Sequence, residues 1–121
     1  MIRIKRFVKS FGYAFKGIEQ LIRSEQNARV HLLATVVVII AGITVGISNG
    51  EWAVICIAIG LVWMAEAINT ALEKLVDIVS PERNPKAKAI KDMAAGAVLI
   101  CAVMAVAVAL FIFVPYIIGH P

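Results

Sequence analysis

The sequence predicts an all-α integral membrane protein with three transmembrane helices plus an N-terminal amphipathic surface helix. Hydrophobic residues make up 61% of the 121 positions and charged residues only 17%, a composition outside the range of soluble globular domains. The chain also contains three long segments with few charged residues, each long enough to cross a bilayer. This composition excludes a disordered tail, a secreted disulfide scaffold and a nucleic-acid-binding module, and it leaves room for a single domain over residues 1–121.

The N-terminal segment, about residues 1–28, is predicted to be a helix that lies on the membrane surface. Apolar residues such as Ile4, Phe7 and Phe11 follow a helical spacing, and Lys and Arg residues stand between them. A helix with one apolar and one basic face is typical of segments that lie in the membrane interface.

Three spans follow, over about residues 30–50, 52–79 and 90–118. The first contains no Asp, Glu, Lys or Arg. Its 21 residues would extend roughly 30 Å as a helix, the thickness of the hydrocarbon layer. The second is uncharged up to Ala65 and then carries acidic residues, whereas the third is uncharged from Met93 through Gly119. Pro115 lies near the end of the third span, where a kink or a stop is tolerated.

The loops predict the orientation of the spans. The loop around residues 48–51 has no Lys or Arg, while the loop over residues 80–92 has four. Because positively charged loops stay on the cytoplasmic side, the N-terminus and the second loop are expected in the cytoplasm. The first loop and the C-terminus, including His120, are expected outside.

A polar stripe on the second span is the most informative feature for function. Glu66, Asn69, Thr70, Glu73 and Asp77 fall within an arc of roughly 100° on one face of a helix. Ionisable groups at membrane depth are costly, so three on one face indicate a compensating partner, of which a cation is the simplest. A solvated helix end is the alternative for the outermost of them, Asp77.

More polar groups are expected at the same membrane boundary. Glu25 precedes the first span and could share a metal ion with Glu73, because Mg²⁺ accepts one or two carboxylates together with phosphate oxygens and water. Lys91 and Asp92 precede the third span and offer a positive charge suited to phosphate. His31 is interpreted as a hydrogen-bonded interfacial group. The residues alone therefore indicate cation chemistry at the cytoplasmic face of a membrane.

Two pairs of segments resemble the small prokaryotic diacylglycerol kinase family, which includes the undecaprenol kinases. The first pair is residues 66–77 (EAINTALEKLVD) and 87–97 (AKAIKDMAAGA), and the second is residues 12–17 (GYAFKG) and 24–31 (SEQNARVH). The resemblance implies a homotrimer in the bacterial cytoplasmic membrane, with active sites shared between subunits. It further implies an enzyme that uses ATP and Mg²⁺ to phosphorylate the hydroxyl of a membrane lipid.

The resemblance also implies roles for individual residues. Glu66 matches the general base, Asn69 would help to orient it, and Glu25 and Glu73 match the metal-binding carboxylates. Four further residues match nucleotide-contacting positions: Arg6, Tyr13, Lys91 and Asp92. The loop residues Glu82, Arg83 and Asn84 are further candidates for nucleotide contact, although many relatives carry Tyr-His after this glutamate, and Arg83 is the one suited to phosphate.

Two choices stay open at this point. The lipid is undecaprenol or diacylglycerol, and residues 24–31 together with the loop around Pro85 look more like the undecaprenol type. A small proton- or cation-coupled transporter that uses Glu66, or a non-catalytic assembly subunit, is the alternative to a kinase. The clustering of every acidic residue except Glu51 toward the cytoplasmic end favours the kinase, since a transporter needs its carboxylate reachable from both sides.

Overall fold

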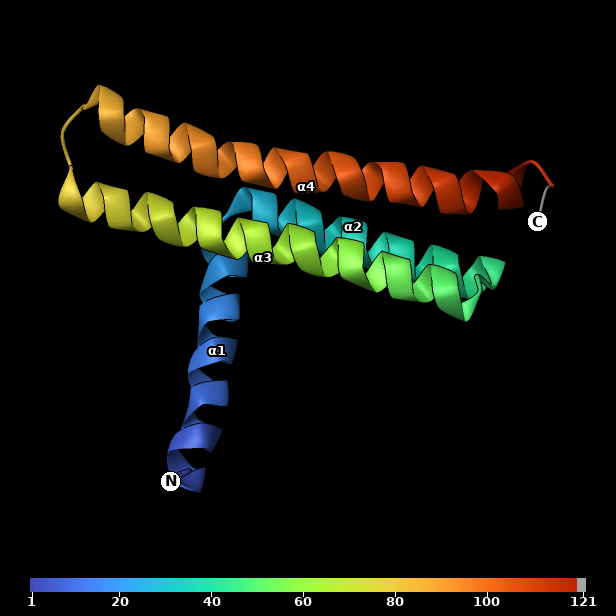
Figure 1. The fold of residues 1–121 in the computed structure, drawn as a ribbon, viewed down its shortest axis with the longest axis horizontal. Coiled ribbons are helices and arrows are strands. Elements are labelled where there is room, and N and C mark those ends of the chain that lie inside the picture. The colour runs from blue at the N-terminus through green and yellow to red at the C-terminus, as the bar shows by residue number, and fades with distance from the viewer. Residues whose placement is uncertain (120–121) are drawn as a thin grey trace.

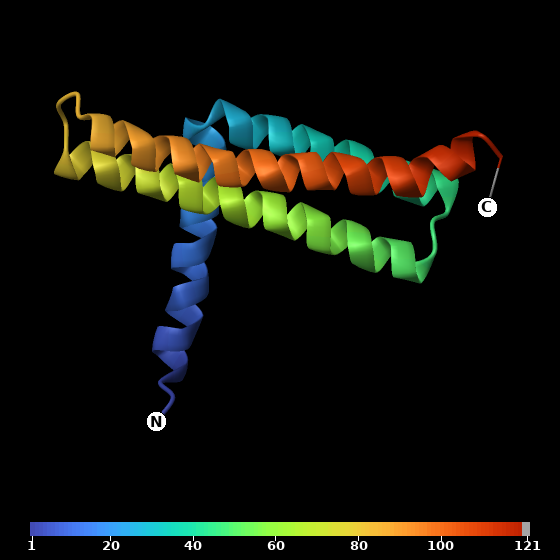
Figure 2. The same ribbon diagram turned by 45° about the horizontal axis from the view of Figure 1, so that its top comes forward.

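The computed structural model describes residues 1–119 as four helices (Figure 1). They are α1 (Ile4–Ser24), α2 (Gln26–Val45), α3 (Asn49–Val79) and α4 (Pro85–Ile117). Helices α2, α3 and α4 lie side by side, and α1 projects sideways from them in both ribbon views (Figures 1 and 2). The described residues contain no strand. His120 lies outside the described residues.

Helices α2, α3 and α4 are each long and apolar enough to cross a membrane. They correspond to the three expected spans, with shifted ends. Helix α2 begins at Gln26 and stops at Val45, and α4 begins at Pro85 rather than near residue 90. Helix α1 is present over Ile4–Ser24, and its position on a membrane surface stays a prediction.

The turn between α2 and α3 is set by a glycine and a cap. Gly46 has a φ of 76°, a left-handed conformation that favours glycine, and its N–H and that of Ile47 both donate to the carbonyl of Gly42. Ser48 then starts α3 with a capping box, because its hydroxyl accepts from the N–H of Glu51 while the Glu51 carboxylate accepts from the N–H of Ser48.

Prolines and a second cap define the loop between α3 and α4. Helix α3 ends at Val79, two residues before Pro81. The Asn84 side chain accepts a hydrogen bond of 2.9 Å from the Lys86 N–H, and Pro85 occupies the first position of α4. The helix then continues through Pro115 to Ile117.

Packing inside the chain is concentrated between α3 and α4, while α2 packs less extensively and about equally against α3 and α1. A small core near the α2–α3 turn is formed by Ile47, Ile55 and Ile112. At the same end, the Tyr116 hydroxyl donates to the Glu51 carboxylate and so ties α4 to α3. Most apolar side chains on the outer faces are exposed, for example Phe111 at 82%, as expected of surfaces that meet lipid or other membrane helices.

Candidate functional site

The polar stripe of α3 runs from the interior of the bundle to its charged end. Glu66, Asn69 and Thr70 are buried, with exposed fractions of 1%, 6% and 4%. Glu73 is half-buried and Asp77 is exposed. Buried polar side chains need partners, so the surroundings of the first three indicate what this site does.

Glu66 is held between a hydroxyl and an imidazole. Its Oε1 accepts a hydrogen bond of 3.4 Å from Thr70 Oγ1, one turn further along α3. Its Oε2 lies 3.5 Å from Nε2 of His31, which comes from α2. Neither Oε2 nor Nε2 has a hydrogen-bond partner of good geometry, although both atoms are buried. The two groups therefore face each other across the α2–α3 contact, each without another partner.

Asn69 contacts the second carboxylate of the stripe. Its Nδ2 donates to Oε1 of Glu73 at 3.4 Å, and its Oδ1 is buried without a partner. The resemblance implied that Asn69 orients Glu66. In the structure its amide hydrogen bond goes to Glu73 instead.

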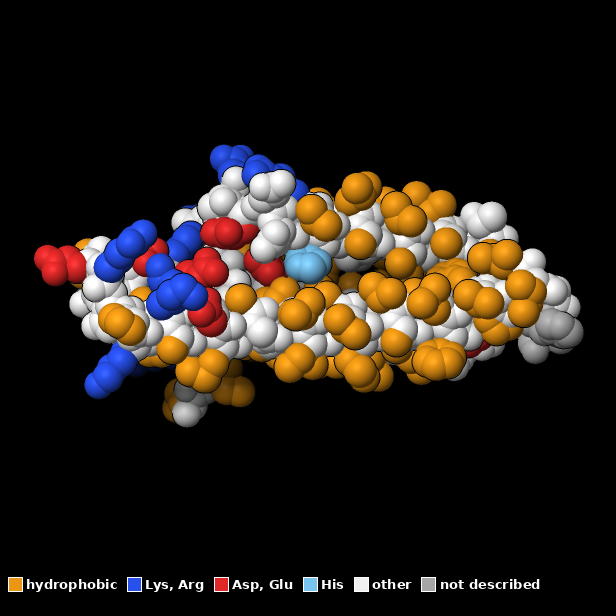
Figure 3. Space-filling model, turned by 90° about the horizontal axis from the view of Figure 1, so that it is seen from above, with side chains coloured by type: hydrophobic (Ala, Val, Ile, Leu, Met, Phe, Trp, Pro, Cys, Tyr) orange, Lys and Arg blue, Asp and Glu red, His pale blue; other side chains and the backbone are white. Residues whose placement is uncertain are grey.

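These side chains line an open pocket of about 280 Å³ between α2, α3 and α4. Its polar lining comes from α2 and α3, and its apolar lining comes from α4 and from Val30 of α2. The polar lining residues are Asn27, His31, Glu66, Asn69 and Glu73, and the apolar ones include Ala95, Val98, Leu99 and Ala102. The space-filling view shows charged side chains gathered at one end of the molecule and an apolar surface over the rest, with a histidine between them (Figure 3). The pocket thus has carboxylates on one side and a hydrocarbon surface on the other.

Of the two carboxylates expected to bind a metal ion, Glu73 lines the pocket and Glu25 does not. Glu25 lies at the α1–α2 junction, half-buried and two residues before Asn27, which lines the pocket. Within residues 1–119, no three His, Cys, Asp or Glu side chains converge closely enough to hold a metal by themselves. The Glu73 carboxylate and the unpartnered amide oxygen of Asn69 are ligand types that Mg²⁺ accepts together with water and phosphate oxygens.

Lys91 and Asp92 belong to two separate ion pairs. Lys91 Nζ contacts the carboxylate of Asp77 across the α3–α4 hairpin, and Asp92 accepts from Lys88 Nζ at 2.7 Å within α4. Neither residue lines the pocket that contains Glu66. Asp77 therefore has a structural partner.

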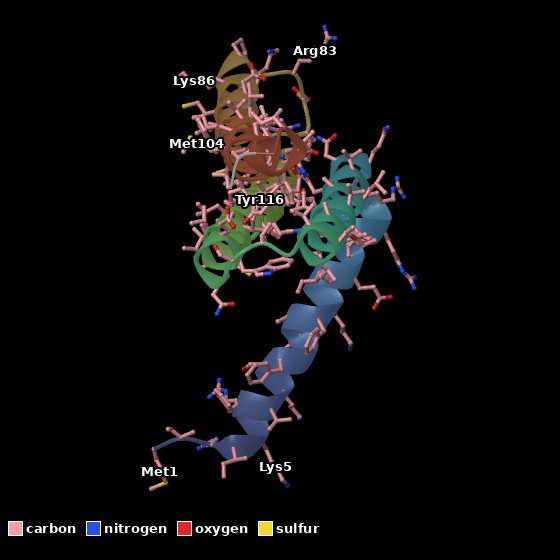
Figure 4. The ribbon with its side chains drawn as sticks, turned by 90° about the vertical axis from the view of Figure 1, so that its right-hand side faces the viewer. Met1, Lys5, Arg83, Lys86, Met104 and Tyr116 are labelled. Atoms are coloured by element: carbon pink, nitrogen blue, oxygen red, sulfur yellow. The ribbon has the colours of Figure 1, made fainter. Side chains whose placement is uncertain are left out.

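The remaining candidates lie at two distant places. Arg6 and Tyr13 are exposed on α1 and do not line the pocket. The labelled residues Met1 and Lys5 mark the free end of α1, at the opposite side of the molecule from Arg83 (Figure 4).

In the α3–α4 loop, the Arg83 side chain points outward (Figure 4). The carbonyl of Glu82 accepts from Ser80 Oγ, and Asn84 is used as the cap of α4. The chain therefore brings Glu66, Asn69 and Glu73 together in one pocket and leaves these loop residues, like Arg6 and Tyr13, outside it.

Sequence reasoning missed the partner of Glu66. His31 was expected only as a hydrogen-bonded interfacial group, and no pairing with Glu66 was inferred. One signal was available, because His31 is the single titratable residue in the run 30–50 and lies near the same end of its span as Glu66. The contact of α2 with α3 that joins them, however, is not readable from one sequence.

Comparison with known proteins gives a consistent result. Residues 12–113 match the model of the prokaryotic diacylglycerol kinase family. The chain is 42% identical to the undecaprenol kinase of Bacillus subtilis over 112 residues, and this alignment covers 93% of this chain and 91% of the relative. It is 35% identical over 94 residues to a diacylglycerol kinase of Pseudomonas aeruginosa, with 78% of this chain and 76% of the relative covered. A diacylglycerol kinase of Synechocystis is 39% identical over 100 residues, which are 82% of this chain and 57% of that longer protein.

Proposed function

Because the chain belongs to the prokaryotic diacylglycerol kinase family, and is therefore a multi-pass membrane lipid kinase, we propose that it transfers the γ-phosphate of ATP to the hydroxyl of a lipid alcohol with the help of Mg²⁺. The observation that carries this proposal is the buried carboxylate of Glu66 in an open pocket with polar walls from α2 and α3 and an apolar wall from α4. Such a pocket can admit a phosphate chain along one wall and a lipid along the other.

Glu66 is the general base of the proposed reaction. Its carboxylate takes the proton from the lipid hydroxyl while the hydroxyl oxygen attacks the γ-phosphorus. The burial of Glu66 supports this role, since a carboxylate shielded from water and aimed into a pocket is unusual for a structural residue. Thr70 holds one carboxylate oxygen in place by its hydrogen bond.

Glu73 and Glu25 are the residues that would hold Mg²⁺. When bound, the ion neutralises the charge of the phosphate oxygens, which is most of what phosphoryl transfer requires. Asn69 supports this assignment because it donates to Glu73 Oε1 and so orients a carboxylate that would otherwise move freely.

The nucleotide would be bound at the charged end of the α3–α4 hairpin by Lys91, Asp92 and Arg83, and by Arg6 and Tyr13. Because α1 projects away from its own pocket, we propose a homotrimer in which the site is shared between subunits and α1 contacts a neighbouring one. The exposed apolar faces of α2 and α4 support such an assembly.

The proposed setting is the bacterial cytoplasmic membrane, with the charged end of the molecule toward the cytoplasm, where ATP is found. Undecaprenol is the proposed substrate in preference to diacylglycerol. The similarity to an undecaprenol kinase over 93% of the chain supports this choice.

The test uses the purified protein in detergent with labelled ATP, Mg²⁺ and either undecaprenol or diacylglycerol. We expect label in undecaprenol, and we expect Glu66→Gln to lose about 100-fold or more of the turnover because the base is removed. Glu51→Gln is the matched control, since it makes the same change at the other end of the same helix. Transfer at the normal rate by Glu66→Gln would refute the base, and no label in either lipid would refute the proposed substrates.

A further inference from the structure

We propose that His31 is a positioning residue for Glu66, which holds the carboxylate in place and accepts the proton that it removes from the lipid hydroxyl. This inference rests on the proposed role of Glu66 as the base. It assigns a function to a residue that lies on a different helix from the polar stripe.

The first observation is the pairing of two otherwise unpartnered atoms. His31 Nε2 and Glu66 Oε2 are 3.5 Å apart, and both are buried without another hydrogen-bond partner. This distance is slightly longer than a good hydrogen bond, and such contacts in active sites often tighten once substrate is bound. Because unpartnered buried polar atoms are costly, each group is the natural partner of the other once a proton lies between them.

The second observation is that Thr35 and Trp63 contact His31 and its surroundings. Thr35 Oγ1 donates to the His31 carbonyl at 2.7 Å and accepts from Trp63 Nε1 at 3.0 Å. The Trp63 ring also stands edge-on to the imidazole, with 6.4 Å between the ring centroids. The Thr35 bond lies within α2 and reaches the His31 backbone, while the two Trp63 contacts join α3 to α2 and place the indole edge beside the imidazole.

The third observation concerns the route of the proton. The Glu66 side chain is 1% exposed, whereas the His31 side chain is 16% exposed and lines the open pocket. Within residues 1–119, no Lys or Arg forms an ion pair with Glu66. The other titratable group in the pocket lining is Glu73, and the lining from α4 is apolar. Histidine is the side chain that readily takes up and releases a proton near neutral pH.

The proton balance follows from this arrangement. The lipid O–H bond breaks and its proton moves to Glu66, while the lipid oxygen bonds to the γ-phosphorus and the electron pair of the broken P–O bond leaves with ADP. The proton then moves from the Glu66 carboxyl to Nε2 of neutral His31, which carries its own hydrogen on Nδ1. The imidazolium gives up a proton to water in the pocket and returns to the Nδ1–H form, so that Nε2 is again free to accept. Glu66 is again ionised and ready for the next turnover.

The experiment compares His31→Ala and His31→Gln with the unchanged enzyme in the lipid phosphorylation assay. We expect kcat to fall about 10- to 100-fold in both variants, while KM for ATP and for the lipid stays within about twofold, because the lost group acts on proton transfer and not on binding. Added imidazole should restore part of the kcat of His31→Ala, since the pocket is open beside the missing ring. Thr35→Val is the matched control: it removes the hydrogen bonds to the His31 carbonyl and from Trp63 but keeps the imidazole, so its activity should not respond to imidazole.

The outcomes separate this inference from the proposed function. If His31→Ala keeps a normal kcat while Glu66→Gln is inactive, the role of His31 is overturned and the base stands. If Glu66→Gln is active, the base is overturned and the role of His31 with it. If His31→Ala raises KM and its kcat does not respond to imidazole, His31 has a purely structural or binding role, and its role as proton acceptor is overturned. Should His31→Ala fail to fold, as judged by far-UV circular dichroism, the kcat and KM of His31→Gln decide.

Discussion

Replacement of Gly42 by alanine should loosen the junction of α2 and α3, because the ring of Trp52 occupies the space that a side chain needs. A Cβ at Gly42 would lie 2.6 Å from Cη2 and 2.8 Å from Cζ2 of Trp52, and 3.2 Å from Cδ1 of Ile47. The first two distances are shorter than real carbon contacts, so the indole or the helix must move.

The magnitude is the sum of two opposing effects. Overpacking of this kind costs about 1–3 kcal/mol in free energy of unfolding. Alanine in place of glycine inside a helix raises the free energy of unfolding by about 1 kcal/mol, because alanine has the higher helix propensity. Gly60→Ala is the matched control, because it makes the same change in helix α3 where no atom lies within 4 Å of the new Cβ. The two variants should therefore differ by about 1–3 kcal/mol, with Gly42→Ala the less stable.

The assay is unfolding of the detergent-solubilised protein by a denaturing detergent, followed by far-UV circular dichroism. The clash involves atoms of the six-membered indole ring, so Trp52→Phe should remove most of it. We expect the double variant Gly42→Ala, Trp52→Phe to be more stable than the sum of the single changes implies. Equal stability of Gly42→Ala and Gly60→Ala would refute the reasoning.

Three other changes test the site and the loop. Glu73→Gln should raise the Mg²⁺ concentration for half-maximal activity about tenfold or more, measured by metal titration at saturating ATP, whereas a metal dependence unchanged from the parent would contradict its role as a ligand. Lys91→Ala should raise the KM for ATP about tenfold through loss of a charged contact to phosphate. Asp77→Asn only releases Lys91 from its ion pair and should leave this KM unchanged. An equal rise in KM in both variants would mean that Lys91 acts through the ion pair and not through phosphate. Asn84→Ala should lower the free energy of unfolding by about 1 kcal/mol, because it removes the cap of α4. The same unfolding assay measures this change. Lys86→Ala is the control, since it keeps the backbone N–H that the cap accepts from.

The three long helices could be predicted from the sequence because long apolar runs with few charged residues form helices when they cross a membrane. The ends of the helices were harder to place. Helix α2 starts at Gln26 and includes Arg29, since charged residues are tolerated where a helix emerges from the membrane. It stops at Val45 because Gly46 adopts a left-handed conformation, which the hydrophobic pattern does not reveal.

The site was predictable within one helix but not between helices. Helical periodicity alone placed Glu66, Asn69 and Thr70 on one face, and the structure buries all three. The approach of His31 to Glu66 and of Lys91 to Asp77 depends on how neighbouring helices pack, which periodicity does not contain. The use of the Asn84 side chain as a helix cap, rather than as a free group, depends in the same way on where α4 begins.

The unequal lengths of the helices create a step in height at the charged end of the molecule. Helix α3 has 31 residues and α2 has 20, and Figure 1 shows the α3–α4 hairpin reaching past the start of α2. Along α3, the eleven positions from Glu66 to Asp77 correspond to about 16 Å of helical rise. If a nucleotide binds at the tip of the hairpin as proposed, its phosphate chain has to extend along this flank to reach Glu66. The hairpin would then act as a fixed spacer between the water-soluble phosphate donor and the lipid acceptor.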